Sequence, residues 1–276
     1  MTVIAMTREL GSRGTEVAEG IAAKLGLKII HSEIVANQVA ERLGIEHTTV
    51  SRYVDGKASI FERWLINRRK LSRYTCEEML RLAQQGDVLI RGWGAATLLR
   101  DMPQVVSVRV CAPMDFRVRI MKERLGVAEA ETVRQAIERF DAAHARAMRA
   151  TFDVAQEDPL LYHVVLNTER LPVEACVSAV CALAAHPRFR DSFATRTALA
   201  NRLLEARINT ALTEEIGLSM APNGVNVSAA NGKVTLSATS STGSLRAKAE
   251  KVASRITGVR HIDNRIVSVP SRGGGF

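Results

Sequence analysis

Cysteine is scarce in this chain, and aromatic residues make up only 4% of its 276 residues. The four cysteines, Cys76, Cys111, Cys176 and Cys181, form no C-x-x-C pair and have no histidine at zinc-ligand spacing. This pattern excludes a disulfide scaffold and a structural zinc site, and it predicts buried thiols. No run approaches the roughly 18 apolar residues of a membrane-spanning helix, and the N-terminus lacks an export signal, so we expect a soluble cytoplasmic protein.

Basic residues outnumber acidic ones, and this excess is unevenly distributed along the chain. The net charge is +9, and 46% of the residues are hydrophobic, which predicts a folded core rather than a disordered tail. Residues 1–195 carry 27 basic and 24 acidic side chains, whereas residues 196–276 carry 11 and 5. The basic C-terminal part is therefore predicted to be a separate unit. Helix-turn-helix patterns and aromatic RNA-binding motifs are missing, which argues against specific nucleic-acid recognition.

The first 185 residues alternate between short β-branched runs and amphipathic helical stretches. Such runs occupy residues 2–6, 27–30, 87–90, 105–110 and 163–166. Strands separated by helices require crossover connections and therefore predict an α/β fold with a parallel sheet. A last helical stretch, residues 173–184, meets Pro187, which cannot continue it. We place a first domain at 1–185 and a linker at 186–195.

Residues 196–270 are predicted to form a second, smaller α/β domain. A helix precedes a hairpin in which Asn231-Gly232 suits a type I′ turn between residues 225–227 and 234–236. A further helix over 244–256, Gly258 and a strand over 262–269 follow, and residues 271–276 are expected to form a flexible tail.

The best-placed chemical signal is the segment Thr7–Glu16, directly after the first strand. Gly11 and Gly14 permit a tight loop, and a helix that begins there presents N–H groups to an anion. The segment is not a Walker A motif, because Thr15 and Glu16 replace its Lys and Ser/Thr. Arg8 or Arg13 would have to supply the missing charge. The alternative is a glycine turn without a ligand.

The motifs of this half are similar to those of the cytidylate kinase-like family, a branch of the P-loop nucleoside monophosphate kinases. The family loop S-R-x-x-G-S-G-G-R-E is similar to residues 7–16, and V-I-V-G-R-G-A to residues 89–95. Its A-P-x-x-x-R element matches residues 112–117, and D-P-x-L-Y-D-L-V-L-N-T matches residues 158–168. The resemblance implies a P-loop kinase-like parallel five-stranded sheet flanked by helices, with ATP phosphates on residues 11–16, a monophosphate opposite, and Mg²⁺ bridging the phosphates.

The sequence departs from the family at polar positions. Thr15 stands in place of an arginine, His31-Ser32 in place of Asp-Arg, and His163 in place of an aspartate. Trp93 and His144 also occupy positions where an arginine is usual. Loss of guanidinium groups from a phosphoryl-transfer site costs orders of magnitude in rate, since one arginine supplies about 10³-fold or more.

Other arginines are candidates to replace them. Arg13 and Arg91 lie near the loop motifs, and Arg146 and Arg149 follow His144. A basic segment at the expected monophosphate side comprises Arg63, Arg68, Arg69, Lys70 and Arg73, with a solvated helix face as the alternative. The metal ligands are open: Ser12, Thr15 or Glu16 could each contribute, and Glu16 could instead complement the helix dipole.

The C-terminal part is similar to a BON domain in its hairpin and in the segment Gly258–Val269. This resemblance implies a small α/β fold that binds phospholipid or a small ligand. Because the region is basic, we expect an anionic small ligand or a phospholipid headgroup as its partner. A homo-oligomer is expected only on general grounds.

Three functions remain open at this stage. The first is phosphoryl transfer from ATP to a nucleoside monophosphate such as CMP. The second is a degenerate nucleotide sensor coupled to the BON domain, and the third is a non-catalytic scaffold that acts through the BON domain. The predicted catalytic set is Arg117, Asp141, Arg146 and Arg149, and the predicted cofactor-binding set is Arg8, Gly11, Ser12, Arg13, Gly14, Thr15 and Glu16.

Overall fold

The computed structural model describes residues 1–54, 66–92, 94–216, 224–240 and 243–269, and it divides into two compact units. The N-terminal unit is Met1–Thr195 and the C-terminal unit is Arg196–Phe276. No helix within the described ranges has both the length and the hydropathy needed to cross a bilayer. Arg63, Trp93 and the tail over 271–276 lie outside the described residues.

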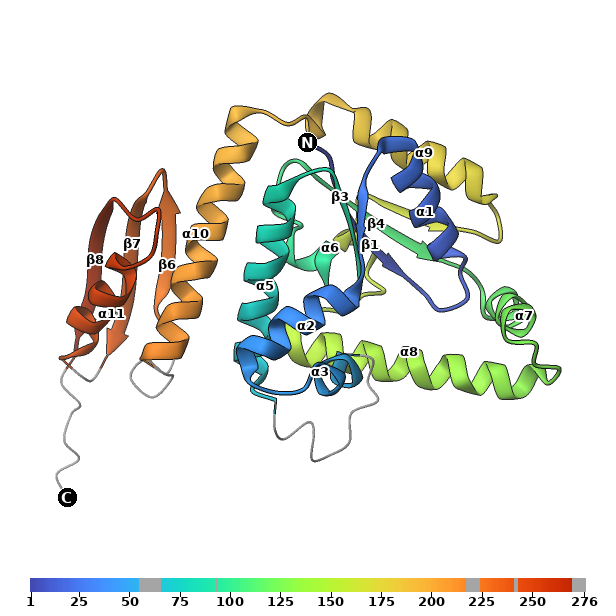
Figure 1. The fold of residues 1–276 in the computed structure, drawn as a ribbon, viewed down its shortest axis with the longest axis horizontal. Coiled ribbons are helices and arrows are strands. Elements are labelled where there is room, and N and C mark those ends of the chain that lie inside the picture. The colour runs from blue at the N-terminus through green and yellow to red at the C-terminus, as the bar shows by residue number, and fades with distance from the viewer. Residues whose placement is uncertain (55–65, 93, 217–223, 241–242, 270–276) are drawn as a thin grey trace, which may run out of the picture. The chain divides into compact units, whose positions relative to one another are not determined.

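The N-terminal unit is built on a five-stranded parallel sheet with the strand order β2-β3-β1-β4-β5, which confirms the predicted fold class (Figure 1). The strands are β1 (Val3–Arg8), β2 (Lys28–Ile30), β3 (Val88–Arg91), β4 (Val105–Cys111) and β5 (Val164–Asn167). The predicted runs for the first and third strands ended at Met6 and Ile90. Both strands continue into an arginine, because the ladder needs backbone groups and not apolar side chains.

Helices cover both faces of this sheet (Figure 1). One face packs against α1 (Gly14–Leu25) and α9 (Val173–Ala185), which contact each other. Further helices are α2 (Ser32–Leu43), α3 (His47–Val54), α5 (Arg68–Gln85), α6 (Ala95–Leu98), α7 (Met114–Leu125) and α8 (Ala130–Phe152). The 3-10 turn η1 (Pro159–Leu161) precedes β5 in the chain, and the 3-10 turn η2 (Pro187–Phe189) follows α9.

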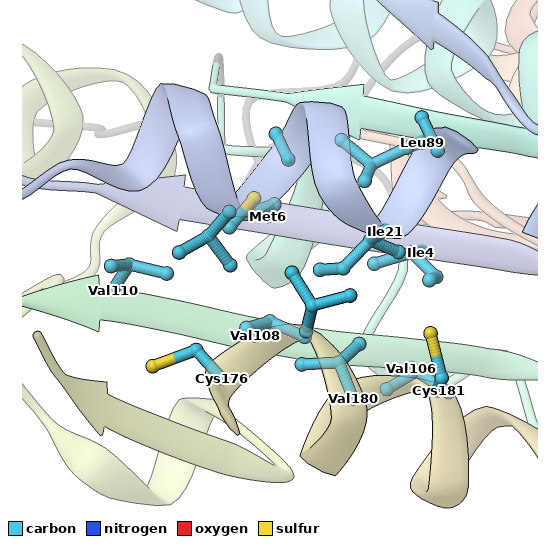
Figure 2. Close-up of a cluster of buried hydrophobic side chains, with 14 of the residues drawn as sticks. Ile4, Met6, Ile21, Leu89, Val106, Val108, Val110, Cys176, Val180 and Cys181 are labelled. Atoms are coloured by element: carbon cyan, nitrogen blue, oxygen red, sulfur yellow. The ribbon is translucent and has the colours of Figure 1, made fainter. Parts of the chain in front are cut away.

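The main core lies between β1, β4 and the helices α1 and α9. Figure 2 shows Ile4 and Met6 of β1 and Val108 of β4 facing Ile21 and Val180. Cys176 and Cys181 are buried on α9, whereas Cys76 and Cys111 are only half-buried, so the expectation of four buried thiols holds for two. Phe189 of η2 also belongs to this core, so part of the expected linker packs on the N-terminal unit.

The C-terminal unit has a three-stranded sheet, β6 (Asn226–Ala230), β7 (Lys233–Ser240) and β8 (His261–Ser268), in that order. β6 and β7 form the predicted hairpin, and Asn231 (φ 52°) and Gly232 (φ 82°) both adopt the left-handed region that a type I′ turn needs. β7 and β8 are parallel and joined through α11 (Leu245–Ser254). Apolar residues of α10 (Phe193–Glu215) and α11, among them Ile208 and Ala249, pack on one face of the sheet, which contributes Leu236 of β7.

Candidate functional site

Parallel strands bring the polar residues that follow their apolar cores to one edge of the sheet. Arg8 ends β1, Arg91 ends β3, and His31 follows β2 directly. The loop from Glu9 to Arg13 leaves β1 at this edge and leads into α1. Binding sites of α/β folds form outside these carboxyl ends. The edge is therefore the candidate site.

The loop backbone needs glycine at two places. Gly11 has φ +80°, and a Cβ there would lie 2.7 Å from the Arg117 carbonyl oxygen and 2.9 Å from Met121 Cγ on α7. A Cβ on Gly14 would lie 2.6 Å from the Arg8 Cβ. Gly11 and Gly14 thus hold the loop against α7 and against the end of β1. Arg13 adopts a left-handed conformation (φ 55°, ψ 19°) and directs the chain into α1.

The first turn of α1 offers uncapped N–H groups. Arg13 stands at the N-cap, and its side chain makes no capping hydrogen bond. Within the described part of the chain, the N–H groups of Gly14, Thr15 and Glu16 donate to no backbone carbonyl, and the first such bond of the helix is Val17 N–H to Arg13 O, 3.2 Å. Free N–H groups at a helix start favour an anion.

The Ser12 side chain points into the protein and not toward the edge. Ser12 is fully buried, and its hydroxyl donates to the Glu9 carbonyl at 2.8 Å and lies 3.3 Å from that of Val110. The buried Thr168 hydroxyl donates to the Ser12 carbonyl at 2.7 Å. These bonds tie the loop to the neighbouring strands β4 and β5, so Ser12 contributes to the shape of the loop.

An ion-pair network lies beneath the loop. The Glu9 carboxylate accepts from Arg109 at 2.7 Å and from the Ala112 N–H at 3.2 Å. Arg117, which is 4% exposed, donates from Nε to the Leu10 carbonyl at 2.7 Å and from Nη2 to both carboxylate oxygens of Asp141 at 2.7 and 2.9 Å. Burial raises the pKa of Asp141, although Arg117 acts in the opposite direction. The guanidinium of Arg117 is thus engaged by the loop and by α8.

Arg8, Arg91 and Arg124 form a second group of cations, separate from this ion-pair network. Arg8 is half-buried, and no carboxylate pairs with its guanidinium among the described residues. Burial lowers the pKa of Arg8, the positive charges of Arg91 and Arg124 lower it further, and Glu16 and Glu33 act in the opposite direction. Arg91 donates to His31 Nδ1 at 2.8 Å. Because a guanidinium can only donate, Nδ1 of His31 is the acceptor in this pair. Three arginines around uncapped N–H groups form a site for an anion.

Most of the remaining predicted arginines are exposed on the surface. Arg13 is exposed and lies 3.6 Å from Glu16. Arg146 and Arg149 are exposed on α8, and Met148 between them is buried. At 100° per residue, Arg146 points about 160° away from Met148. In α5, Arg68 and Arg69 are exposed, and burial, followed by the charge of Arg69, lowers the pKa of Arg73.

Three residues that fix the loop were missed by sequence reasoning: Glu9, Arg109 and Thr168. Arg109 carried a usable signal, because it is a charged residue inside the apolar run Val105–Val110 and a buried charge needs a counter-ion. Glu9 directly follows the neighbouring strand, in which Thr7 pairs with Arg109. Burial alone would lower the pKa of Arg109, but Glu9 and Tyr162 raise it.

Comparison with known proteins agrees with this architecture. The family model described as "Cytidylate kinase-like family" matches residues 3–170. The chain belongs to the cytidylate kinase-like family. Residues 201–270 match the model of the BON domain, which identifies the C-terminal unit.

Relatives cover the N-terminal part of the chain. The cytidylate kinase of Pyrobaculum aerophilum is 25% identical over 177 residues, which are 64% of this chain and 89% of that protein. The cytidylate kinase of Ignicoccus hospitalis is 26% identical over 185 residues, which are 65% and 97%. An uncharacterized protein from Eubacterium ventriosum has a similar fold, with a TM-score of 0.53, 17% identity and coverage of 66% of this chain and 97% of that one.

Proposed function

We propose that the N-terminal unit binds a nucleoside triphosphate at the Glu9–Arg13 loop and transfers its terminal phosphoryl group to a nucleoside monophosphate of the CMP class. The observation that carries this proposal is the half-buried Arg8, which has no carboxylate partner in the described part of the chain and which feels the positive charges of Arg91 and Arg124 near the uncapped start of α1. A desolvated cation with cationic neighbours is stabilised when an anion binds among them. The cytidylate kinases among the relatives support the reaction class.

In this proposal the phosphates take the N–H groups of Gly14, Thr15 and Glu16, and Arg8 supplies the charge that a Walker lysine would give. Arg91 and Arg124 offset the remaining negative charge around the transferred group. Because the transition state of phosphoryl transfer gains little from covalent chemistry, the placement of these charges is the main contribution of the protein. Arg13 contributes less, since Glu16 offsets its charge.

The residues present fit a Mg²⁺ ion. Mg²⁺ takes oxygen ligands and commonly binds through one or two protein side chains together with substrate phosphates. The Ser12 hydroxyl is committed to the Glu9 carbonyl, whereas the partly buried Thr15 and the exposed Glu16 lie in the first turn of α1. Thr15 and Glu16 would hold the ion, which would neutralise part of the phosphate charge. No cluster of three or more acidic, histidine or cysteine ligands occurs in the described ranges.

Arg117 and Asp141 have a positioning role in this proposal. Arg117 holds the Leu10 carbonyl at 2.7 Å and keeps Gly11 in contact with α7, so it fixes the shape of the loop. Asp141 fixes Arg117. Arg146 and Arg149, on the exposed surface of α8, are proposed as secondary contacts to a bound phosphate.

The test is titration calorimetry of the full chain with ATP, CMP, AMP and dCMP, with and without Mg²⁺, followed by a phosphoryl-transfer assay on the same samples. We expect ATP binding that weakens at least tenfold in Arg8→Ala and turnover with CMP that this variant abolishes. Arg139→Gln is the matched control, because Arg139 is an exposed arginine on α8. Failure of every nucleotide to bind would refute the proposal.

A second candidate function is a nucleotide sensor without turnover. The observation that favours it is the engagement of Arg117 by Asp141 and Leu10, which leaves fewer arginines for the reacting phosphates. Binding of ATP without phosphoryl transfer to any of the monophosphates would support the sensor over the enzyme.

For the BON domain we propose an anionic ligand, a phospholipid headgroup in the first instance. The sheet face not covered by α10 and α11 carries Lys233, His261 and Arg265, and only one acidic residue, Asp263, lies among them. Co-sedimentation with phosphatidylglycerol vesicles, but not with phosphatidylcholine vesicles, is the expected result. The double variant Lys233→Glu/Arg265→Glu should lose this binding, which falls with added salt.

A further inference from the structure

The two edges of the C-terminal sheet differ in how their backbone groups are satisfied. At the β6 edge, side chains of α10 accept the outward N–H groups: Glu205 Oε1 accepts from Ala229 at 2.9 Å, and Asn201 Oδ1 accepts from Asn231 at 2.8 Å. This edge is therefore closed to another strand.

The β8 edge is open by comparison, and no described element of the C-terminal unit pairs beyond it (Figure 1). The Val269 N–H donates to the carbonyl oxygen of Ser240, the last residue of β7, at 2.9 Å. The odd-numbered residues of β8 therefore direct their N–H groups toward β7. With a period of two, the even-numbered residues direct theirs outward. Of these, only Ile266 N–H has an acceptor within the described residues, Asn264 Oδ1 at 3.2 Å. Those of Ile262, Asn264 and Ser268 remain available.

The side chains along β8 are complementary to a second copy of the same strand. If two β8 strands pair antiparallel about Asn264, Ile262 lies opposite Ile266 of the second copy, and both direct backbone groups to the shared edge. Asp263 then lies opposite Arg265 of the second copy, and Arg265 opposite its Asp263. Cross-strand pairs of opposite charge stabilise a sheet, and both ion pairs form only in this register.

The geometry points to a symmetric homodimer in which the β8 edges of two chains pair antiparallel and form one six-stranded sheet. Within one chain Asp263 and Arg265 already form an ion pair at 2.6 Å, in which Arg265 is 67% exposed. Such an exposed pair is weak and can be exchanged for two pairs between chains. In the dimer the Ile266 N–H donates to the carbonyl of Ile262 in the second copy instead of to Oδ1 of Asn264.

Sedimentation velocity of the full chain over a concentration series tests the proposal. We expect a monomer–dimer equilibrium whose Kd rises roughly tenfold or more in Arg265→Glu, because two attractive pairs become repulsive. The exchange Asp263→Arg/Arg265→Asp should restore the wild-type Kd. A chain that stays monomeric up to about 1 mM, or a dimer whose Kd is unchanged in Arg265→Glu, would overturn the inference.

A cross-linking experiment tests the register. His261 and Val267 lie on the uncovered face of the sheet and would be opposite each other in the proposed pairing, at about 4.5 Å between Cα atoms, which suits a disulfide. An oxidised mixture of His261→Cys and Val267→Cys chains should give a cross-linked dimer. Either variant alone should not, because neither position lies opposite itself. Cross-linking of a single variant would contradict the register and with it the proposed interface.

Discussion

At the scale of single residues, the site contains arginines with different surroundings. Arg109 and Arg117 are held by Glu9 and Asp141 beneath the loop, whereas the half-buried Arg8 has no carboxylate partner among the residues that the structure describes. A desolvated cation without a partner reduces stability in the absence of ligand and favours an anion in its presence. Its function can therefore be measured through stability and affinity together.

Replacement of Arg8 by Met should change these two quantities in opposite directions. The free energy of unfolding without ligand should rise by about 1 kcal/mol, because an unpaired charge is replaced by an apolar chain of similar length. The affinity for ATP should fall about tenfold or more. Chemical denaturation and calorimetry measure the two. Arg139→Met is the matched control and should leave both unchanged. A loss of stability in Arg8→Met would show that Arg8 has a partner in solution.

His163 should make stability depend on pH. The Ser107 N–H donates to Nδ1 of His163 at 3.0 Å, so Nδ1 accepts this hydrogen bond and carries no proton. Partial burial lowers the pKa of His163, and the charge of Arg188 lowers it further. The unfolded chain then binds the proton more readily than the folded one, so this contribution is present above about pH 6.5 and is lost as the pH falls below it.

His163→Asn is the variant that isolates this effect, since the Asn oxygen can accept from the Ser107 N–H but does not titrate. Urea unfolding between pH 7.5 and 5.5 should show a smaller loss of stability in His163→Asn than in the wild type. Equal slopes for the two proteins would mean that other groups account for the pH dependence.

At the scale of elements, the contact with α7 fixes the position of the Glu9–Arg13 loop. Gly11 packs directly on the Arg117 carbonyl, and Arg117 in turn holds the Leu10 carbonyl. The position of the loop therefore depends on α7, and through Asp141 on α8. A change at this contact should affect binding without touching any group that meets the ligand.

Gly11→Ala is expected to destabilise the chain and to weaken ATP binding. The new Cβ would lie 2.7 Å from a backbone oxygen, in addition to the cost of φ +80°. Gly26→Ala is the matched control, because Gly26 has φ +66° and nothing lies within 4 Å of its Cβ position. The control should lose about 1–2 kcal/mol for the left-handed conformation and keep its ATP affinity. Equal effects of the two variants in both assays would show that loop packing does not matter.

The sequence allowed the fold to be predicted more fully than the site. Apolar runs such as Val105–Val110 predict buried parallel strands directly, and Asn231-Gly232 predicts the hairpin. Arg117 and Asp141 were predicted as separate catalytic residues, and their mutual ion pair was not, because they lie on different helices 24 residues apart. The inward orientation of Ser12 likewise depends in part on the Val110 carbonyl of β4, which is 98 residues away and which a local pattern does not contain.

At the scale of the whole molecule, the chain combines two units with separate cores. The N-terminal core joins β1 and β4 to α1 and α9, and the C-terminal core joins its sheet to α10 and α11. The Glu9–Arg13 loop belongs to the N-terminal unit. A ligand stabilises the cooperative unit that binds it.

Differential scanning calorimetry of the full chain should therefore show two transitions, of which ATP raises only one. At 100 times Kd the stabilisation is about 2.7 kcal/mol, which is a clear shift in Tm. The transition that moves should also be the one lowered by Gly11→Ala. A single transition, or a shift of both by ATP, would mean that the two units unfold cooperatively.

The pairing of Arg117 with Asp141 also limits how this site can evolve. Loss of Asp141 removes the shorter ion pair of the buried Arg117 and leaves it only the Glu9 carboxylate at 3.7 Å, whereas loss of Arg117 frees the Leu10 carbonyl and a partly exposed Asp141; either change should lower the stability of the domain. The two positions are therefore expected to change together or not at all, whereas exposed Arg146 and Arg149 can be exchanged one at a time. Divergence of the N-terminal unit would then begin on the surface of α8, while the residues that support the loop are retained.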